Sequence, residues 1–175
     1  MSAGMRHRGP DDQGQFYDER AGVGLGHLRL SIVDLSAQGH QPMASASGRY
    51  VISYNGEVYN FATLRQELEQ SGLARHPFRG GSDTEVILAA IEAWGLERAV
   101  QRFIGMFAFA LWDTHENALH LVRDRLGVKP LFYGGNRDCV LFGSELRALS
   151  AHPSFSRELD PGAVGSYLRY GYVPG

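Results

Sequence analysis

Arg49-Tyr50-Val51-Ile52-Ser53-Tyr54-Asn55-Gly56-Glu57-Val58-Tyr59-Asn60 is the stretch that decides the fold. Residues 49–54 alternate in polarity and include β-branched side chains, which predicts a strand. Asn55-Gly56 is a strong turn dipeptide and predicts that the strand ends there. Asn60 is a helix-capping residue type, and apolar residues recur at helical spacing from it to Gly72. The stretch therefore predicts a strand, a tight turn and a helix.

The rest of the chain continues this alternation of helices and short strands. Ser82-Asp83-Thr84-Glu85 has the pattern of a capping box and predicts a helix that ends at Gly95. Further expected helices are 96–103, 144–149 and 159–170; expected strands are 23–26, 30–33, 107–112, 118–123, 131–133 and 140–142, with polar, turn-like stretches at 1–15 and 35–48. Helices grouped beside hairpins predict one layered α+β domain over residues 1–175 rather than a Rossmann fold.

Composition excludes several classes of protein. The 175 residues are 43% hydrophobic and 21% charged, with a net charge of -2, and contain no basic block, so nucleic acid is not an expected partner. The longest apolar run, 104–112, is far shorter than the roughly 20 residues of a membrane span, and the N-terminus lacks the apolar part of a signal peptide. A single cysteine, Cys139, is typical of a reducing, cytoplasmic setting.

Five segments together resemble a known family. They are Arg6-His7-Arg8-Gly9-Pro10-Asp11, Gly26-His27-Leu28-Arg29-Leu30-Ser31-Ile32-Val33-Asp34, Tyr54-Asn55-Gly56-Glu57-Val58-Tyr59-Asn60, Gly81-Ser82-Asp83-Thr84-Glu85 and Arg123-Asp124-Arg125-Leu126-Gly127-Val128-Lys129-Pro130-Leu131. In this order and spacing they resemble the class II glutamine amidotransferase domain of asparagine synthetases. The resemblance implies an N-terminal-nucleophile hydrolase fold, a four-layer αββα sandwich. It also implies hydrolysis of glutamine and transfer of the ammonia to a second, ATP-using domain.

The resemblance also assigns a glutamine site. Free glutamine carries an α-carboxylate and an α-ammonium, which call for a fixed cation and a fixed anion; by resemblance these are Arg29 and Asp83. The Asn55 side chain and the Gly56 N–H are the implied oxyanion hole, and Glu57 is expected to line the same pocket. Taken without the family, Arg29 reads as a strand-edge charge, Asp83 as a helix cap and Asn55-Gly56 as a plain turn.

The nucleophile of the family, an N-terminal cysteine, is missing from Met1-Ser2-Ala3-Gly4. Ser2 is not expected to replace it, and Cys139 reads as a small buried hydrophobe. We expect that the family's first strand is absent, that the chain starts at an internal methionine, and that it is inactive alone. Loss of a central strand exposes unpaired backbone groups, which predicts a homodimer.

No metal or nucleotide site is expected in this domain. The spacing of His7, His27 and His40 matches no common metal pattern, and the glycine-rich runs 22–26 and 80–83 lack a full nucleotide-binding signature. By resemblance, ATP and Mg belong to a C-terminal synthetase domain absent from this chain. Two alternatives stay open: a non-catalytic assembly or regulatory module, and an amidotransferase for a different ammonia acceptor.

Overall fold

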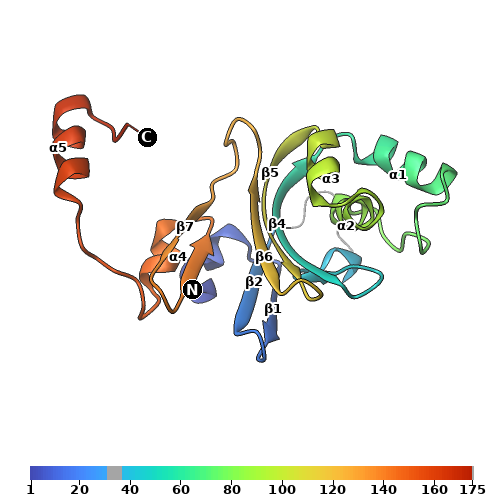
Figure 1. Ribbon diagram of the computed structural model, residues 1–175, viewed down its shortest axis with the longest axis horizontal. Helices are drawn as coiled ribbons and strands as arrows, with labels where there is room; N and C mark the ends of the chain where they lie inside the picture. Colours follow the sequence, from blue (N-terminus) through green and yellow to red (C-terminus); the bar gives the residue numbers. More distant parts are fainter. Residues whose placement is uncertain (31–36, 175) are drawn as a thin grey trace.

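The computed structural model describes residues 1–30 and 37–174 (Figure 1). The strands are β1 (Asp12–Asp18), β2 (Val23–Arg29), β3 (Met43–Ala44), β4 (Tyr50–Val58), β5 (Gly105–Asp113), β6 (Ala118–Arg123), β7 (Phe132–Gly135) and β8 (Val140–Gly143). The α-helices are α1 (Phe61–Gln70), α2 (Asp83–Trp94), α3 (Leu96–Arg102), α4 (Leu146–Ser150) and α5 (Pro161–Tyr170), and the 3-10 helices are η1 (Ser2–Arg8) and η2 (Ala37–Gly39). The α+β class predicted from the sequence is confirmed.

The central sheet has the strand order β3-β4-β5-β6, with every neighbouring pair antiparallel. The predicted turn at Asn55-Gly56 is wrong, because β4 runs through both residues to Val58. Gly56 lies opposite Phe107 on β5. A Cβ atom on Gly56 would lie 2.6 Å from the Phe107 Cα and would also meet the Met106 carbonyl oxygen. The glycine therefore permits two backbones to approach closely instead of reversing the chain.

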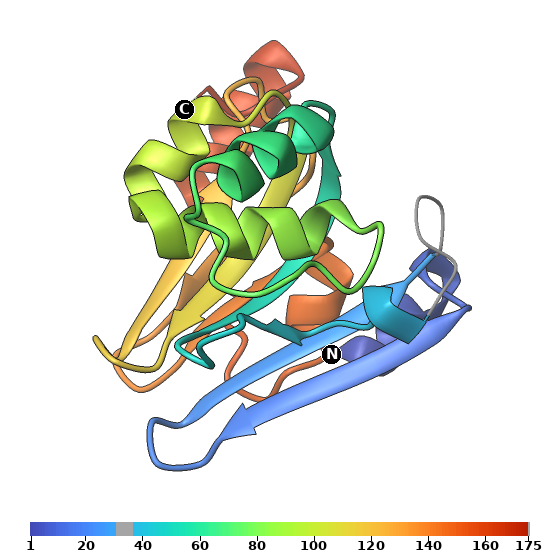
Figure 2. The same cartoon turned by 90° about the vertical axis from the view of Figure 1, so that its right-hand side faces the viewer.

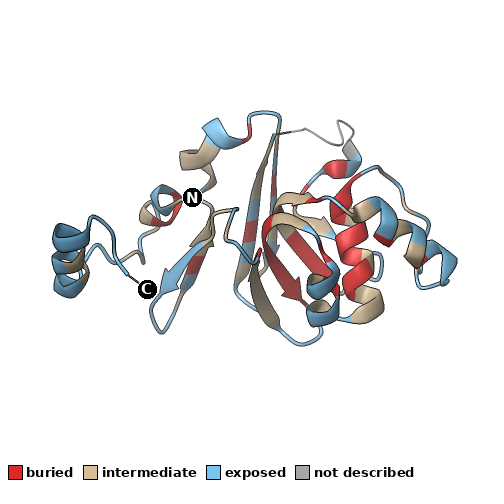
Figure 3. Cartoon of the chain, turned by 90° about the horizontal axis from the view of Figure 1, so that it is seen from above, coloured by how far each residue is buried: buried red, intermediate tan, exposed pale blue. Residues whose placement is uncertain are grey.

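Helices α1–α3 cover one face of this sheet (Figure 1). The cluster of buried side chains combines the strand residues Ile52, Phe109 and Leu111 with the apolar faces of the helices. Figure 3 shows the buried residues concentrated in α2 and in the strands beneath it. Helix α2 starts where the capping pattern predicts, since the Ser82 side chain accepts a hydrogen bond from the Thr84 N–H. Burial of these apolar stripes makes this side of the molecule its main core.

Two hairpins cover the opposite face of the sheet. Figure 1 shows the β1–β2 hairpin on the side away from α1–α3, and Figure 2 shows it extending below these helices. Leu25 of β2 is buried in a second cluster with Val51, Ala110 and Trp112 of the sheet. In the other hairpin, β7–β8, the side chain of Leu141 packs against α4 through Ala148 and Leu149. The order helices, sheet, hairpins and helix is that of the expected αββα sandwich, with the second β layer split into two hairpins.

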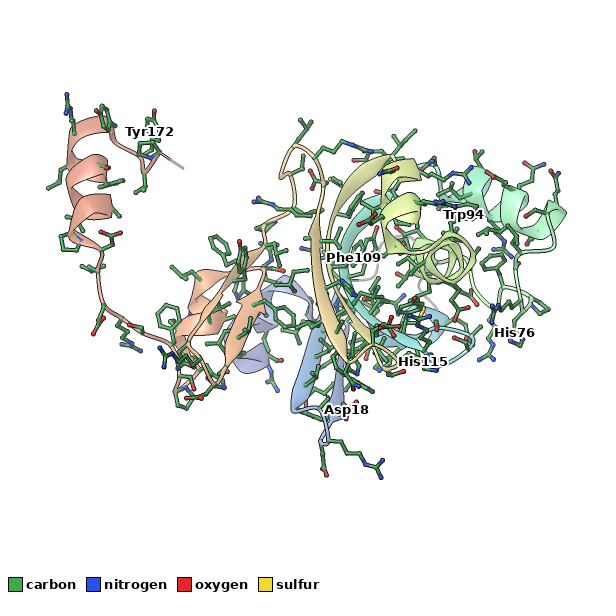
Figure 4. All side chains as sticks on the ribbon, viewed as in Figure 1. Asp18, His76, Trp94, Phe109, His115 and Tyr172 are labelled. Atoms are coloured by element: carbon green, nitrogen blue, oxygen red, sulfur yellow. The ribbon has the colours of Figure 1, made fainter. Side chains whose placement is uncertain are left out.

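Two regions differ from the sequence expectation or lie outside it. Residues 12–15, expected to be turn-like, begin β1, and the predicted strand at 30–33 falls on residues of which 31–33 lie outside the described part. Helix α5 has no buried side chain and stands away from the body, so that Tyr172 lies far from Phe109 in Figure 4. None of the described helices is long and apolar enough to cross a membrane.

Candidate functional site: a cavity between β2, β4 and α2

A cavity of about 1130 Å³ lies between the β1–β2 hairpin, β4, β8 and the N-terminus of α2. Four of the five predicted site residues line it, namely Arg29, Asn55, Gly56 and Asp83. Glu57 does not. Side chains alternate along a strand, so Glu57 lies on the same face as Asn55. It is two residues nearer the end of β4 and lies opposite Met106. Glu57 therefore lies beyond the part of β4 that lines the cavity.

Asp83 is the first residue of α2, and only 6% of it is exposed. Its Oδ2 accepts hydrogen bonds from the Tyr54 hydroxyl, at 2.6 Å, and from the Val58 N–H, at 3.0 Å. Burial, and then the negative charge of Asp83, raise the pKa of Tyr54 above its ordinary value, so the phenol stays a donor. A carboxylate at a helix N-terminus is also stabilised by the helix dipole. Asp83 is therefore a fixed negative charge that joins α2 to β4.

Arg29 ends β2 on the other side of the cavity and is half-buried. In the hairpin it lies opposite Asp12, whose Oδ2 is 2.7 Å from the Nδ1 of His40. This hydrogen bond is the main cause that lowers the pKa of Asp12. Gly39 is buried against the guanidinium: a Cβ there would lie 2.7 Å from the Arg29 Cζ and would meet its Nη2. The absence of a side chain at Gly39 thus leaves the space that the Arg29 guanidinium occupies.

His27 lies two residues before Arg29 on the same strand face and lines the same cavity. Burial lowers the pKa of His27 to about 4, and the positive charge of Arg29 acts in the same direction. The imidazole is therefore neutral at pH 7, which leaves Arg29 as the positive charge of this strand. The Ser53 hydroxyl donates to the Gly26 carbonyl at 3.2 Å, which links this part of β2 to β4.

The edge of β4 away from β5 presents a row of backbone donors. Phe107, opposite Gly56, uses its N–H and C=O for Asp124 on the other side of β5. Gly56 and Phe107 therefore form a pair without mutual hydrogen bonds, and the Gly56 N–H points away from β5. The Tyr54 N–H, which points the same way by strand parity, is bound by the Gln41 side chain. The Asn55 amide, on the cavity wall, makes no hydrogen bond with a described residue, so two donors are available side by side.

Sequence reasoning missed Gln41 and Tyr54 as parts of this site. Gln41 is 7% exposed; its Oε1 accepts from the Tyr54 N–H at 2.7 Å and its Nε2 donates to the Thr84 Oγ1 at 3.4 Å. A glutamine in a polar loop gives no signal of burial, and Tyr54 reads only as a strand residue. Cys139 also lies on the cavity wall, where it packs beside the Leu141 cluster.

The histidines considered as metal ligands lie in separate places. His7 is 3.2 Å from Glu145, His40 pairs with Asp12, and His27 faces the cavity. Across residues 1–30 and 37–174, no three His, Cys, Asp or Glu side chains are grouped so as to hold a metal ion.

Comparison with known proteins adds the family context. Residues 1–175 match the family model described as "Glutamine amidotransferase domain". Asparagine synthetase [glutamine-hydrolyzing] 1 of Bacillus subtilis is 41% identical over 174 residues, which are 99% of this chain and 26% of the relative. Asparagine synthetase [glutamine-hydrolyzing] 3 of the same organism is 44% identical over 162 residues, 91% of this chain and 25% of the relative. The chain thus spans about a quarter of the length of these relatives.

A solved structure shares the fold. The glutamine phosphoribosylpyrophosphate amidotransferase of B. subtilis, in complex with ADP and GMP, superposes with a TM-score of 0.63 at 25% identity. The match covers 79% of this chain and 31% of the other.

Proposed function

Because this chain belongs to the glutamine amidotransferase domain family, we propose that its cavity binds free glutamine for an asparagine-synthetase-like amidotransferase. The observation that carries this proposal is that Arg29, Asn55, Gly56 and Asp83 all line one cavity. A fixed cation and a fixed anion stand on different elements around one space, with a pair of hydrogen-bond donors beside them.

In the proposed complex, Arg29 binds the α-carboxylate and Asp83 binds the α-ammonium. The guanidinium suits a carboxylate because it donates two parallel hydrogen bonds. Asp83 keeps Oδ1 for the ammonium, since both of its hydrogen bonds with described residues use Oδ2. The side-chain amide of glutamine then lies toward Asn55 and Gly56. Their N–H groups are suited to stabilise the oxyanion that forms when the amide carbon is attacked.

We further propose that these 175 residues bind glutamine without hydrolysing it. Hydrolysis adds water to the amide carbon, releases ammonia and leaves glutamate, and in this family a cysteine thiolate makes the first attack. Cys139 is the one cysteine of the sequence, and its side chain packs in an apolar cluster. In an asparagine-synthetase-like amidotransferase, the ammonia would pass to an ATP-dependent synthetase domain, which selects aspartate or another acceptor.

Titration calorimetry with L-glutamine tests the binding proposal. We expect Arg29→Gln to weaken glutamine binding by at least about 10-fold, because a charge-assisted bidentate contact is lost. Asp83→Asn should weaken it comparably. Arg20→Gln, at the exposed turn of the β1–β2 hairpin, is the matched control and should bind as the wild type does.

An ammonia-release assay tests the second proposal, and the chain should show no release above background. Release by the unmodified chain would overturn the view that it lacks a nucleophile. A wild-type chain that binds no glutamine would overturn the proposed function and favour an assembly or regulatory module.

A further inference from the structure

Three consecutive residues, Gly39 to Gln41, touch both charged ends of the cavity. We infer that this segment, 39–41, holds Arg29 and Asp83 in register with each other, so that the site accepts only amino acids whose two α-groups are both free. The inference rests on the proposed glutamine site and assigns positioning residues to it. Gly39 and Gln41 line the cavity, whereas His40 lies outside it.

At the Arg29 end, the segment makes contact through two residues. The Gly39 backbone lies against the Arg29 guanidinium so closely that a Cβ would be 2.7 Å from Cζ. His40 binds Asp12, which faces Arg29 across the hairpin. This hydrogen bond holds the Asp12 carboxylate in place opposite Arg29. The two contacts therefore fix where the guanidinium lies.

At the Asp83 end, the segment acts through Gln41. Its side chain accepts from the Tyr54 N–H and donates to Thr84, the residue that follows Asp83 on α2. Tyr54 in turn donates its hydroxyl to the Asp83 Oδ2. Gln41 is thus bound to Tyr54, one of the two donors to the Asp83 carboxylate, and to Thr84, the next residue of α2. Because Gln41 is buried, these hydrogen bonds are costly to break and hold the segment firmly.

The register of the two charges matters because their proposed partners sit on one carbon atom. The α-carboxylate and the α-ammonium of an amino acid are held rigidly relative to each other. If Arg29 or Asp83 shifts by about 1 Å, the ligand can no longer make both contacts at the same time. A blocked amino acid, with one α-group neutral, gains nothing from correct register. The ratio of the affinities for free and blocked glutamine therefore measures how well Arg29 and Asp83 are placed relative to each other. General destabilisation instead weakens the binding of both ligands.

The experiment measures two affinity ratios by calorimetry on the 175-residue chain. One ratio compares L-glutamine with its α-amide, which lacks the carboxylate, and the other compares L-glutamine with N-acetyl-glutamine, which lacks the ammonium. Gly39→Ala should lower the first ratio about 10-fold, because its Cβ displaces the guanidinium. Gln41→Met should lower the second about 5-fold. Gly134→Ala is the control, since a Cβ at Gly134 meets open space.

Each outcome decides the inference. Variants that fold and keep both wild-type ratios would overturn it, even if glutamine affinity falls. If Gly39→Ala fails to fold, His40→Gln decides by the same criterion, because half of the His40 side chain is exposed and the change removes the hydrogen bond that holds Asp12 opposite Arg29; we expect a fall of about 3-fold in the first ratio. A wild type that binds no glutamine defeats the proposed function and this inference together. A wild type that binds free glutamine selectively, with variants equally selective, defeats the inference alone.

Discussion

The Asp83 end of the cavity and the Arg29 end are built in different ways. Asp83 is almost fully buried, and both of its donors, Tyr54 and Val58, belong to the main core cluster. Arg29 is half-buried on a hairpin, and the nearby pair of Asp12 and His40 is 33% and 50% exposed. One charge is therefore fixed by the core of the domain, and the other is fixed by packing against a short loop.

Because of this difference, we expect substitutions at the two ends to affect different properties: protein stability at the Asp83 end and ligand selectivity at the Arg29 end. Groups that open only with global unfolding are those held in the core, whereas peripheral hairpins open at lower free energy. Substitutions at the Asp83 end should therefore reduce the free energy of unfolding strongly. Substitutions at the Arg29 end should change ligand preference more than stability, with the partly buried His27 as the exception.

Gly56→Ala should cause the largest loss, about 3 kcal/mol in the free energy of unfolding, measured by urea denaturation. The added Cβ would be forced against the Phe107 Cα and the Met106 carbonyl, so β4 and β5 must separate locally. Gly134→Ala, in an exposed strand with open space around it, should change stability by less than about 0.5 kcal/mol. Equal losses in the two variants would show that β4 and β5 are not packed as closely as described.

Acidification should lower the free energy of unfolding through His27, which lies at the Arg29 end of the cavity. The folded-state pKa of His27, about 4, lies below its value of 6.5 in the unfolded chain. The unfolded state thus binds more protons between these values, and stability falls as pH drops from 6.5 to 4, by about 2 kcal/mol. Denaturation midpoints of the wild type and His27→Gln across this range measure the effect. The variant should lose this part of the pH dependence, whereas exposed His76→Gln should keep it.

Tyr54→Phe should cost about 1.5 kcal/mol at pH 7, because the buried Asp83 carboxylate loses a donor. The folded-state pKa of Tyr54 is raised above its ordinary value of 10, so this stabilisation is complete below pH 10 and falls as pH rises further. Urea denaturation at pH 7 and above pH 10 measures both effects. Tyr167→Phe, with an exposed ring on α5, is the control and should match the wild type at pH 7. A Tyr54→Phe variant as stable as that control would contradict the role given to the hydroxyl.

His40→Gln should have the smallest effect on stability, under about 0.5 kcal/mol, since its pair with Asp12 is largely exposed. The same denaturation series measures it. A loss as large as that of Tyr54→Phe would remove the contrast between the two ends.

Local signals in the sequence predicted the helices well. Ser82 caps α2 as the pattern indicates, and the apolar stripes of α1 and α2 face the core. One half of the predicted capping box is absent, because the Glu85 carboxylate binds the N–H groups of Arg79 and Gly80. These signals succeed because capping and periodicity depend on residues within one or two helical turns.

The wrong predictions of secondary structure fall where residues distant in the sequence determine the local structure. Asn55-Gly56 is a turn signal by local chemistry, yet pairing with β5 carries the strand through it, which no neighbouring residue indicates. The polar residues around Gln13 and Gln15 gave no strand signal for β1, because one face of this hairpin is exposed to solvent. The predicted site residues came from a family resemblance. The structure brings four of them to one cavity, but it adds Gln41 and Tyr54, whose roles depend on burial created by the whole fold.

The loop that carries residues 39–41 should not tolerate a change in length. Surface loops usually tolerate extra residues, because lengthening a loop adds little closure entropy. Here an inserted residue would move His40 or Gln41 by up to about 3.5 Å along the chain, beyond reach of Asp12 or of the Tyr54 N–H. Homologues that differ in the length of this loop should therefore differ in substrate preference, even where they share the same arginine and aspartate. Divergence within the family would then proceed by insertion and deletion as well as by substitution.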